Sequence, residues 1–165
     1  VCAITGVLCP SCNEKYRQGV LTDLDIEVAK GMFEIEHRYP EFKNLEMVKS
    51  YDVKTRTGRE AVLVIVRYPS RLDPLFLQSV SKQLSNRLKK PVRVVQESKD
   101  IRRLVSQIIN PARVISVSTV WLPDGSIEYD VIVGRRDYNR MFLNLESVKG
   151  VLYKIVGQRV RFTFL

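Results

Sequence analysis

The sequence predicts an α+β fold in which one structural unit occurs twice within 165 residues. Residues 45–67 and residues 112–134 have the same length, and each consists of an alternating segment, a short turn and a returning segment. The turns fall at Thr57-Gly58 and at Asp124-Gly125, where glycine suits the positive φ angles of a tight hairpin turn. We therefore predict two β-hairpins whose starts lie 67 residues apart in the sequence.

A helix and a short strand follow each predicted hairpin. Apolar residues recur at helical spacing in residues 77–88 and again in residues 148–155. After them, residues 90–95 match residues 158–163 in their alternation of basic and apolar side chains. A repeat of hairpin, helix and strand in one order predicts two similar domains, each with a three-stranded sheet and helices packed on one face. We place a small head at residues 1–19, the first domain at residues 20–97 and the second at residues 98–165.

The first helix is expected over residues 21–39. Thr22 has the side chain of an N-cap, and Asp25 follows three residues later, as in a capping box. Pro40 then stops the helix. The apolar residues recur with a period of about 3.6, which indicates one buried face. They are Leu24, Val28, Met32, Ile35 and Tyr39.

The next helix begins at Asp73 and Pro74, which serve as N-cap and first helical residue. It is expected to run to about residue 89, where the alternating pattern of the closing strand takes over. That strand, over residues 92–96, completes the first domain.

The second domain begins with a helix that Ser98 or Asp100 caps and Asn110-Pro111 stops. After its hairpin, a last helix over residues 144–156 leads to a strand over residues 159–164. Apolar and polar side chains alternate in this strand, which predicts one buried and one solvated face. Val160, Phe162 and Phe164 alternate there with Arg159, Arg161 and Thr163.

The chain is basic, with 27 lysines and arginines against 18 aspartates and glutamates and a net charge of +9. Such an excess favours a polyanionic partner, and RNA, DNA or an acidic lipid would each satisfy it. A basic protein that binds no nucleic acid is the alternative. No apolar run approaches the roughly 20 residues that span a bilayer, and no signal peptide opens the sequence. We therefore expect a cytoplasmic protein without a membrane partner.

The densest basic cluster lies in the predicted loop after the second hairpin and contains Arg135, Arg136, Tyr138 and Arg140. Arginine holds phosphate groups bidentately and tyrosine stacks on bases, so we predict RNA contacts there. Further contacts are predicted from the first hairpin and from the end of the second helix, at Arg56, Arg59, Lys89 and Lys90. The alternatives are a solvated strand face for the hairpin and favourable interaction with the helix dipole for the lysines.

Trp121, the only tryptophan, stands just before the turn of the second hairpin. In an exposed position it would be a stacking platform, and in a buried one it would cover the end of the sheet. Aromatic residues beside hairpin turns often cover a sheet end, so we favour the buried position.

The three cysteines, Cys2, Cys9 and Cys12, all lie in the first twelve residues. An odd, clustered number argues against a secreted disulfide framework. Cys9-Pro10-Ser11-Cys12 is predicted to form a turn with the spacing that lets two thiolates bind one tetrahedral Zn²⁺, and Cys2 would be a third ligand. No convincing fourth ligand is present, unless one lies upstream of Val1. Without zinc, the segment would be a knuckle that holds no metal or would carry three reduced thiols, and a redox pair is disfavoured because no strand precedes it.

Helix, hairpin, helix and strand, occurring twice with a closing strand such as Val92-Arg93-Val94-Val95, resemble tandem type II KH domains. Together with its Cys-Pro-Ser-Cys head, the whole chain is similar to the archaeal NusA-like KH proteins. The resemblance implies RNA binding and a part in transcription elongation or termination, or in work on ribosomal RNA.

The chain departs from KH domains in one respect. Those domains hold RNA with a G-x-x-G loop between paired helices, where the backbone and a helix N-terminus approach the phosphates. No G-x-x-G occurs here, and the corresponding places, residues 75–78 and residues 143–146, read LFLQ and LNLE. Large apolar side chains there would keep phosphates away from the backbone.

No catalytic constellation is evident, because the lone histidine, His37, falls in a predicted helix and no glycine-rich phosphate loop is present. We therefore expect a non-catalytic, RNA-associated factor of the NusA-like kind. The alternative is a protein-interaction module that contacts RNA polymerase or the ribosome. A nucleic-acid enzyme or its subunit is a third, disfavoured interpretation.

Overall fold

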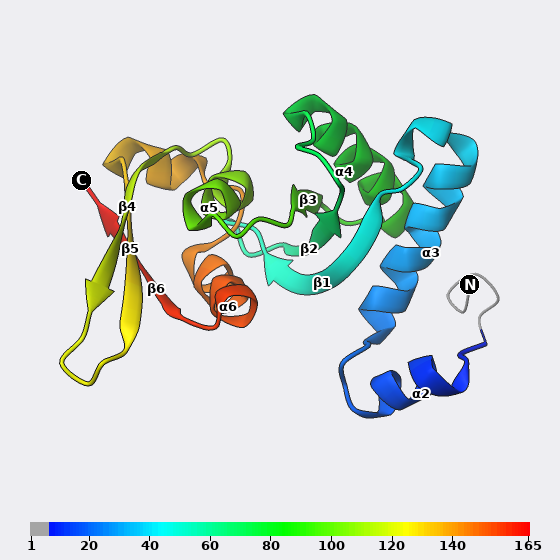
Figure 1. The fold of residues 1–165 in the computed structure, drawn as a ribbon. Coiled ribbons are helices and arrows are strands. Elements are labelled where there is room, and N and C mark those ends of the chain that lie inside the picture. Colours follow the sequence, from blue (N-terminus) through cyan, green and yellow to red (C-terminus); the bar gives the residue numbers. More distant parts are fainter. Residues whose placement is uncertain (1–6) are drawn as a thin grey trace. The chain divides into compact units, whose positions relative to one another are not determined.

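The computed structural model describes residues 7–165 and has an α+β fold with two three-stranded mixed sheets and helices packed against them (Figure 1). The predicted fold class is confirmed. The contacts divide the chain into two compact units. The first runs to Asp52 and continues with Val62–Gln96, and the second consists of Val53–Ala61 and Glu97–Leu165. The tip of the first hairpin thus belongs to the second unit.

The first sheet has the strand order β1-β2-β3. β1 and β2 form the predicted hairpin, and β3 pairs with β2 in parallel, with Val64 opposite Val94. α3 and α4 pack on the sheet around Val28, Val64 and Leu84, which are fully or almost fully buried. The elements in order are α2 (Pro10–Arg17), α3 (Asp23–Arg38), a 3₁₀ turn η1 (Pro40–Phe42), β1 (Glu46–Lys54), β2 (Glu60–Arg67), α4 (Pro74–Leu88) and β3 (Val92–Gln96).

The second sheet repeats this plan with the strand order β4-β5-β6. β4 and β5 are antiparallel and β5 and β6 are parallel, so Val131 lies between Val117 and Phe162. α5 and α6 lie on one side of this sheet (Figure 1). The elements are α5 (Ile101–Ile109), β4 (Val114–Trp121), β5 (Ile127–Val133), a 3₁₀ helix η2 (Arg135–Arg140), α6 (Leu145–Val156) and β6 (Arg159–Phe164).

The helix boundaries follow the side chains that satisfy free backbone donors. Thr22 and Asp25 form the predicted capping box at the start of α3. Asp73 accepts a hydrogen bond from Leu75 N at 2.8 Å, and Pro74 is the first residue of α4. Asp100, rather than Ser98, caps α5.

Two segments differ from their prediction. Residues 135–140 form the 3₁₀ helix η2 instead of a loop. Cys9-Pro10-Ser11-Cys12 is not an isolated turn, because Cys9 is the N-cap of α2 and Cys12 lies in its first turn. Proline at the first helical position is favourable, since its missing N–H would have no partner there.

Trp121 is 71% exposed, so the predicted core position is wrong. The β4–β5 hairpin extends past the helices of its unit (Figure 1), and Ser118 and Thr119 are exposed near the same end. The helices therefore do not cover the end of the sheet that Trp121 occupies.

A buried carboxylate ties α3 to β1. Asp25 is 1% exposed, forms an ion pair with Lys49, and accepts hydrogen bonds from Ser50 N at 2.9 Å and Ser50 Oγ at 2.6 Å. Burial by itself would raise the pKa of Asp25, but the hydrogen bonds from Lys49 and Ser50 outweigh burial and hold that pKa below its ordinary value.

Within residues 7–165, no helix is long and apolar enough to cross a bilayer.

Candidate nucleic-acid interface

The 3₁₀ helix η2 is fixed against the end of the second sheet. Arg135 N donates a hydrogen bond to Leu165 O at 2.6 Å, which ties the start of η2 to the residue after β6. The rings of Tyr138 and Phe164 pack edge to face, with centroids 5.0 Å apart. Tyr138 remains 42% exposed, so part of its ring is available to an unpaired base.

The arginines of η2 differ in their partners. Arg140 Nη1 pairs with Asp137 Oδ1 at 3.1 Å. Arg135 and Arg136 are exposed, and over residues 7–165 neither side chain has an acidic or hydrogen-bonding partner. Their guanidinium groups therefore keep their donors for a phosphate without first breaking an ion pair.

Arg113 joins this cluster, although its sequence position gives no sign of it. Arg113 N lies 3.4 Å from Asp137 Oδ2, and its side chain is exposed. The register explains the proximity, because Val114 lies opposite Val133, just before η2. A prediction of that register would have identified Arg113.

The tip of the β1–β2 hairpin brings two further predicted residues into the unit that holds η2. Thr55 forms an antiparallel bridge with Leu143, and Arg56 N donates to Phe142 O at 3.1 Å. Phe142 follows Arg140 by two residues, so Arg56 lies beside the segment that leaves η2. Arg59 N donates to Thr55 Oγ1 at 3.1 Å, and both Arg56 and Arg59 are exposed.

The same tip occupies the start of α6, where a KH domain would present its glycine loop. Leu143 is fully buried, and Asn144 N donates to Lys54 O at 3.0 Å. Lys54 N in turn donates to Ser147 Oγ at 2.9 Å, and Ser147 N donates to the capping Asn144 Oδ1 at 2.8 Å. The backbone donors of Asn144 and Ser147 are therefore already in use.

The KH resemblance implies a pair of helices between each hairpin and its closing strand. Within residues 7–165, each hairpin is followed by only one α-helix, which is α4 in the first unit and α6 in the second. In the second unit the first helix of the pair is reduced to η2, and in the first unit residues 68–73 contain no helix. Lys89 and Lys90 follow α4 in the first unit, not in the unit that holds η2. Lys89 adopts a left-handed conformation with φ of 57° as the C-cap of α4.

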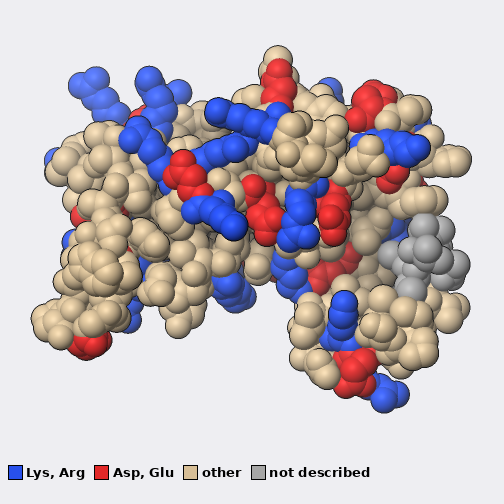
Figure 2. All heavy atoms as spheres, in the orientation of Figure 1, with Lys and Arg blue, Asp and Glu red and all other residues tan. Residues whose placement is uncertain are grey.

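The excess positive charge is concentrated in the second unit. That unit carries 14 lysines and arginines against 8 aspartates and glutamates, a net charge of +6 out of the total of +9. Lysine and arginine side chains gather in the region where Figure 1 draws η2 and α5 (Figure 2). The electrostatic potential around the second unit is therefore more positive than that around the first, and it favours an anionic partner more strongly.

The structure describes two of the three predicted zinc ligands. Cys9 is exposed and Cys12 is half-buried, and Cys2 lies outside the described residues. Residues 7–165 bring together no three His, Cys, Asp or Glu side chains that would hold a metal ion. Cys9 and Cys12 alone supply two of the four ligands that a structural zinc site needs, so zinc binding stays a prediction.

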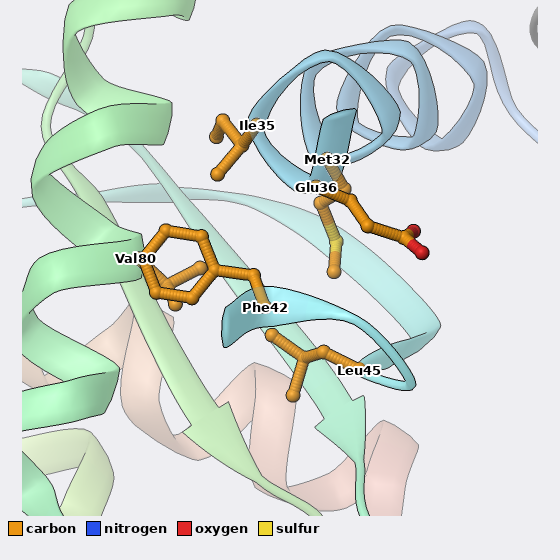
Figure 3. A pocket seen from close by; sticks show the side chains of 6 residues that line it. All are labelled: Met32, Ile35, Glu36, Phe42, Leu45 and Val80. Carbon is orange, nitrogen blue, oxygen red and sulfur yellow. The ribbon is translucent and has the colours of Figure 1, made fainter. Parts of the chain in front are cut away.

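The first unit has an apolar hollow between α3, η1 and α4 (Figure 3). Its lining side chains include Met32, Phe42 and Leu45, and the carboxylate of Glu36 points away from it (Figure 3). The hollow therefore offers no polar group that would orient a nucleotide.

No protein-family model matches the chain, and no curated protein matches it. Among solved structures, the chain is similar to the crystal structure of APE1850, with 16% sequence identity and a TM-score of 0.48. The similarity covers 82% of this chain and 96% of that one.

Proposed function

We propose that this protein is a non-catalytic RNA-associated factor of the NusA-like kind that acts in transcription elongation or termination. RNA binds to the second unit through a surface that we call the η2 surface, formed by Arg113, Arg135, Arg136, Tyr138 and Arg140 with Arg56 and Arg59 of the hairpin tip. The observation that carries the proposal is the unpaired state of Arg135 and Arg136 in the described chain, beside a partly exposed tyrosine. Phosphates bind the arginines, and a base stacks on Tyr138.

In this proposal the η2 surface contacts the phosphate backbone of the RNA and stacks on a base, so it discriminates little between RNA sequences. Arginine contacts to phosphate carry no sequence information, and stacking tolerates every base. Lys89 and Lys90 are further proposed RNA contacts, and they belong to the first unit by itself. The backbone donors of Asn144 and Ser147 have protein partners, so this start of α6 takes no part.

Crosslinking of the full chain to single-stranded RNA, followed by mass spectrometry, tests the proposal. Crosslinks are expected at Tyr138 and in peptides that contain Arg56 or Arg135. Crosslinks confined to the first unit, or binding that is insensitive to salt between about 50 and about 200 mM, would overturn it.

The alternative function is a protein-interaction module that contacts RNA polymerase or the ribosome. The closure of the α6 N-terminus by the hairpin tip favours it, since the usual RNA grip of the KH fold is then absent there. Binding of purified polymerase or ribosomes that persists unchanged in an R135A/R136A variant, together with no RNA binding, would favour this function.

We further propose that Cys2, Cys9 and Cys12 hold a structural Zn²⁺ in the head. Metal analysis of the purified chain is expected to give about one zinc per chain, and C9S/C12S is expected to abolish it. A zinc content unaffected by that double substitution would contradict the proposal.

A further inference from the structure

A polar cavity lies between the C-terminal halves of α3 and α4, and all its lining residues belong to the first unit. The two helices pack side by side (Figure 1), and Gly31 of α3 lies so close to α4 that an added Cβ would be 3.2 Å from Leu84 Cδ2. Gly31 and the buried Ile35 form the inner, apolar wall of the cavity. Its volume of about 240 Å³ is below the roughly 300–1,000 Å³ of pockets for drug-sized ligands, so it suits one small group of a larger molecule.

An ion pair fixes two charged groups of the cavity lining. Arg87 Nε donates to Glu34 Oε2 at 2.6 Å, and Arg87 Nη2 donates to Glu34 Oε1 at 3.0 Å. These bonds use one lone pair of each carboxylate oxygen and only part of the donors of the guanidinium. Glu34 can therefore still accept hydrogen bonds from a ligand, and Arg87 can still donate them.

Three more lining side chains carry hydrogen-bonding groups that no protein group uses. Arg38 and Asn86 are exposed, and Gln83 is half-buried. Over residues 7–165, none of these three side chains forms a hydrogen bond or an ion pair. Each amide offers both an acceptor and donors, and the guanidinium offers donors alone. The cavity thus presents unused donors together with unused acceptors.

The order of charged groups along α3 defines what the cavity can bind. Glu34 and Arg38 are four residues apart and therefore lie beside each other on one face of the helix. A ligand that meets both needs hydrogen-bond donors next to acceptors. A bare phosphate has acceptors alone, and the Glu34 carboxylate would repel it. Guanine has the required edge, since O6 and N7 accept from an arginine and the neighbouring N1–H and N2 amino groups donate to a carboxylate.

The other bases fit Glu34 and Arg38 less well. Adenine has an amino group where guanine has O6, so it would meet the Arg38 guanidinium with a donor. Neither cytosine nor uracil combines two neighbouring acceptors with two neighbouring donor groups. The pair of side chains therefore selects guanine among the bases.

We infer that this cavity binds a guanine base. Arg38 donates to O6 and N7, Glu34 accepts from N1–H and from the N2 amino group, and the ring lies against Gly31. The base belongs to a free guanine nucleotide or to an unpaired nucleotide of RNA, which present the same edge. In the RNA case the inference rests on the proposed function, and Lys89 and Lys90 contact the adjoining phosphates.

Isothermal titration calorimetry of the full chain with guanosine and adenosine 5′-monophosphates tests the inference for a free nucleotide. The guanine nucleotide is expected to bind on the order of tenfold more tightly, which is the discrimination that a bidentate contact provides. Inosine 5′-monophosphate lacks the N2 amino group and is expected to bind with intermediate affinity. Fluorescence anisotropy with uridine oligonucleotides that carry one central guanosine or adenosine makes the same comparison for RNA. A guanine preference in only one of the two assays supports the inference and identifies the source of the base.

R38A provides the sharpest variant, because Arg38 is exposed and has no partner within residues 7–165 whose loss would disturb folding. The variant is expected to weaken guanine binding by about tenfold and to abolish the preference over adenine. K82A is the matched control, since it removes an exposed lysine of α4 that does not line the cavity. It is expected to keep the preference.

Failure of this inference can be told apart from failure of the proposed function. R135A/R136A weakens RNA binding if the proposed function holds, and it leaves the ratio of guanine to adenine affinity unchanged. Equal affinities for the guanine and adenine mononucleotides, together with equal affinities for the two oligonucleotides, overturn the inference even where RNA still binds. Where no RNA binds at all, the mononucleotide comparison alone decides. A guanine preference that R38A retains overturns the assignment of the base to this cavity.

Discussion

Ser81 of α4 provides the hydrogen-bond acceptor for the backbone N–H of Val94 in β3. Its hydroxyl accepts from Val94 N at 3.0 Å and donates to Leu77 O at 2.8 Å. Replacement by alanine leaves a backbone donor of the almost fully buried Val94 without its partner. S81A is expected to lower the free energy of unfolding by about 1–3 kcal/mol, the usual cost of an unsatisfied buried donor. Urea denaturation measures the change.

Ser79 is the matched control, because it lies on the same helix and its exposed hydroxyl donates only to Leu75 O. S79A is expected to change stability by less than about 0.5 kcal/mol. Equal losses for S79A and S81A would mean that serine on α4 matters for the helix and not for the edge of β3.

Asp25 predicts a pH dependence of stability. D25N removes the charge that Lys49 pairs with and weakens the hydrogen bonds from Ser50, and is expected to cost about 2–3 kcal/mol near neutral pH. The folded pKa of Asp25 lies below the unfolded value of about 3.9. Its contribution is therefore present above that value and is lost as pH falls through the folded pKa.

The difference in unfolding free energy between D25N and the unaltered chain is accordingly expected to shrink below about pH 4. D52N, on the exposed side of the same strand, controls for the loss of one surface carboxylate. A D25N penalty that stays constant down to about pH 3 would show that packing, and not the ionised carboxylate, ties α3 to β1.

The η2 surface predicts a change in the salt dependence of RNA binding. Two phosphate contacts are lost in R135A/R136A, so the slope of log affinity against log salt is expected to become shallower by about 1.4. R159A is the control, since Arg159 pairs with Glu128 at 3.4 Å. A slope that R159A changes as much as the double variant does would argue for diffuse attraction by net charge.

Trp121 predicts a small effect on stability. Because its side chain is 71% exposed, W121A is expected to change the free energy of unfolding by less than about 0.5 kcal/mol. L152A, at a fully buried position of α6, is expected to cost about 2–5 kcal/mol. Thermal unfolding of the two variants makes the comparison, and a large loss for W121A would place the indole in a packed site.

The duplicated pattern is sufficient to predict nearly every element. The alternation of apolar and polar side chains predicts strands β3 and β6. The preference of Thr and Asp side chains for free backbone N–H groups predicts the helix caps at Thr22 and Asp73. These sequence patterns are local. The predictions from them are correct because the packing around the buried Leu84 and Leu152 requires the same faces of the helices and strands to be apolar.

The features that the sequence does not predict depend on contacts between distant segments. Local pattern cannot show how far a hairpin extends past its helices, which is why the prediction for Trp121 is wrong. Arg113 and Arg56 approach η2 only through strand register and through the bridge between Thr55 and Leu143. Neither relationship has a sequence signature in a single chain.

The assignment of Val53–Ala61 to the second unit governs how the protein is divided for experiments. A fragment cut after residue 97 would leave its C-terminal product without the partner of Leu143 and without the acceptor of Asn144 N. Expression of that half would therefore require a fused copy of the nine-residue tip, or addition of the tip as a separate peptide.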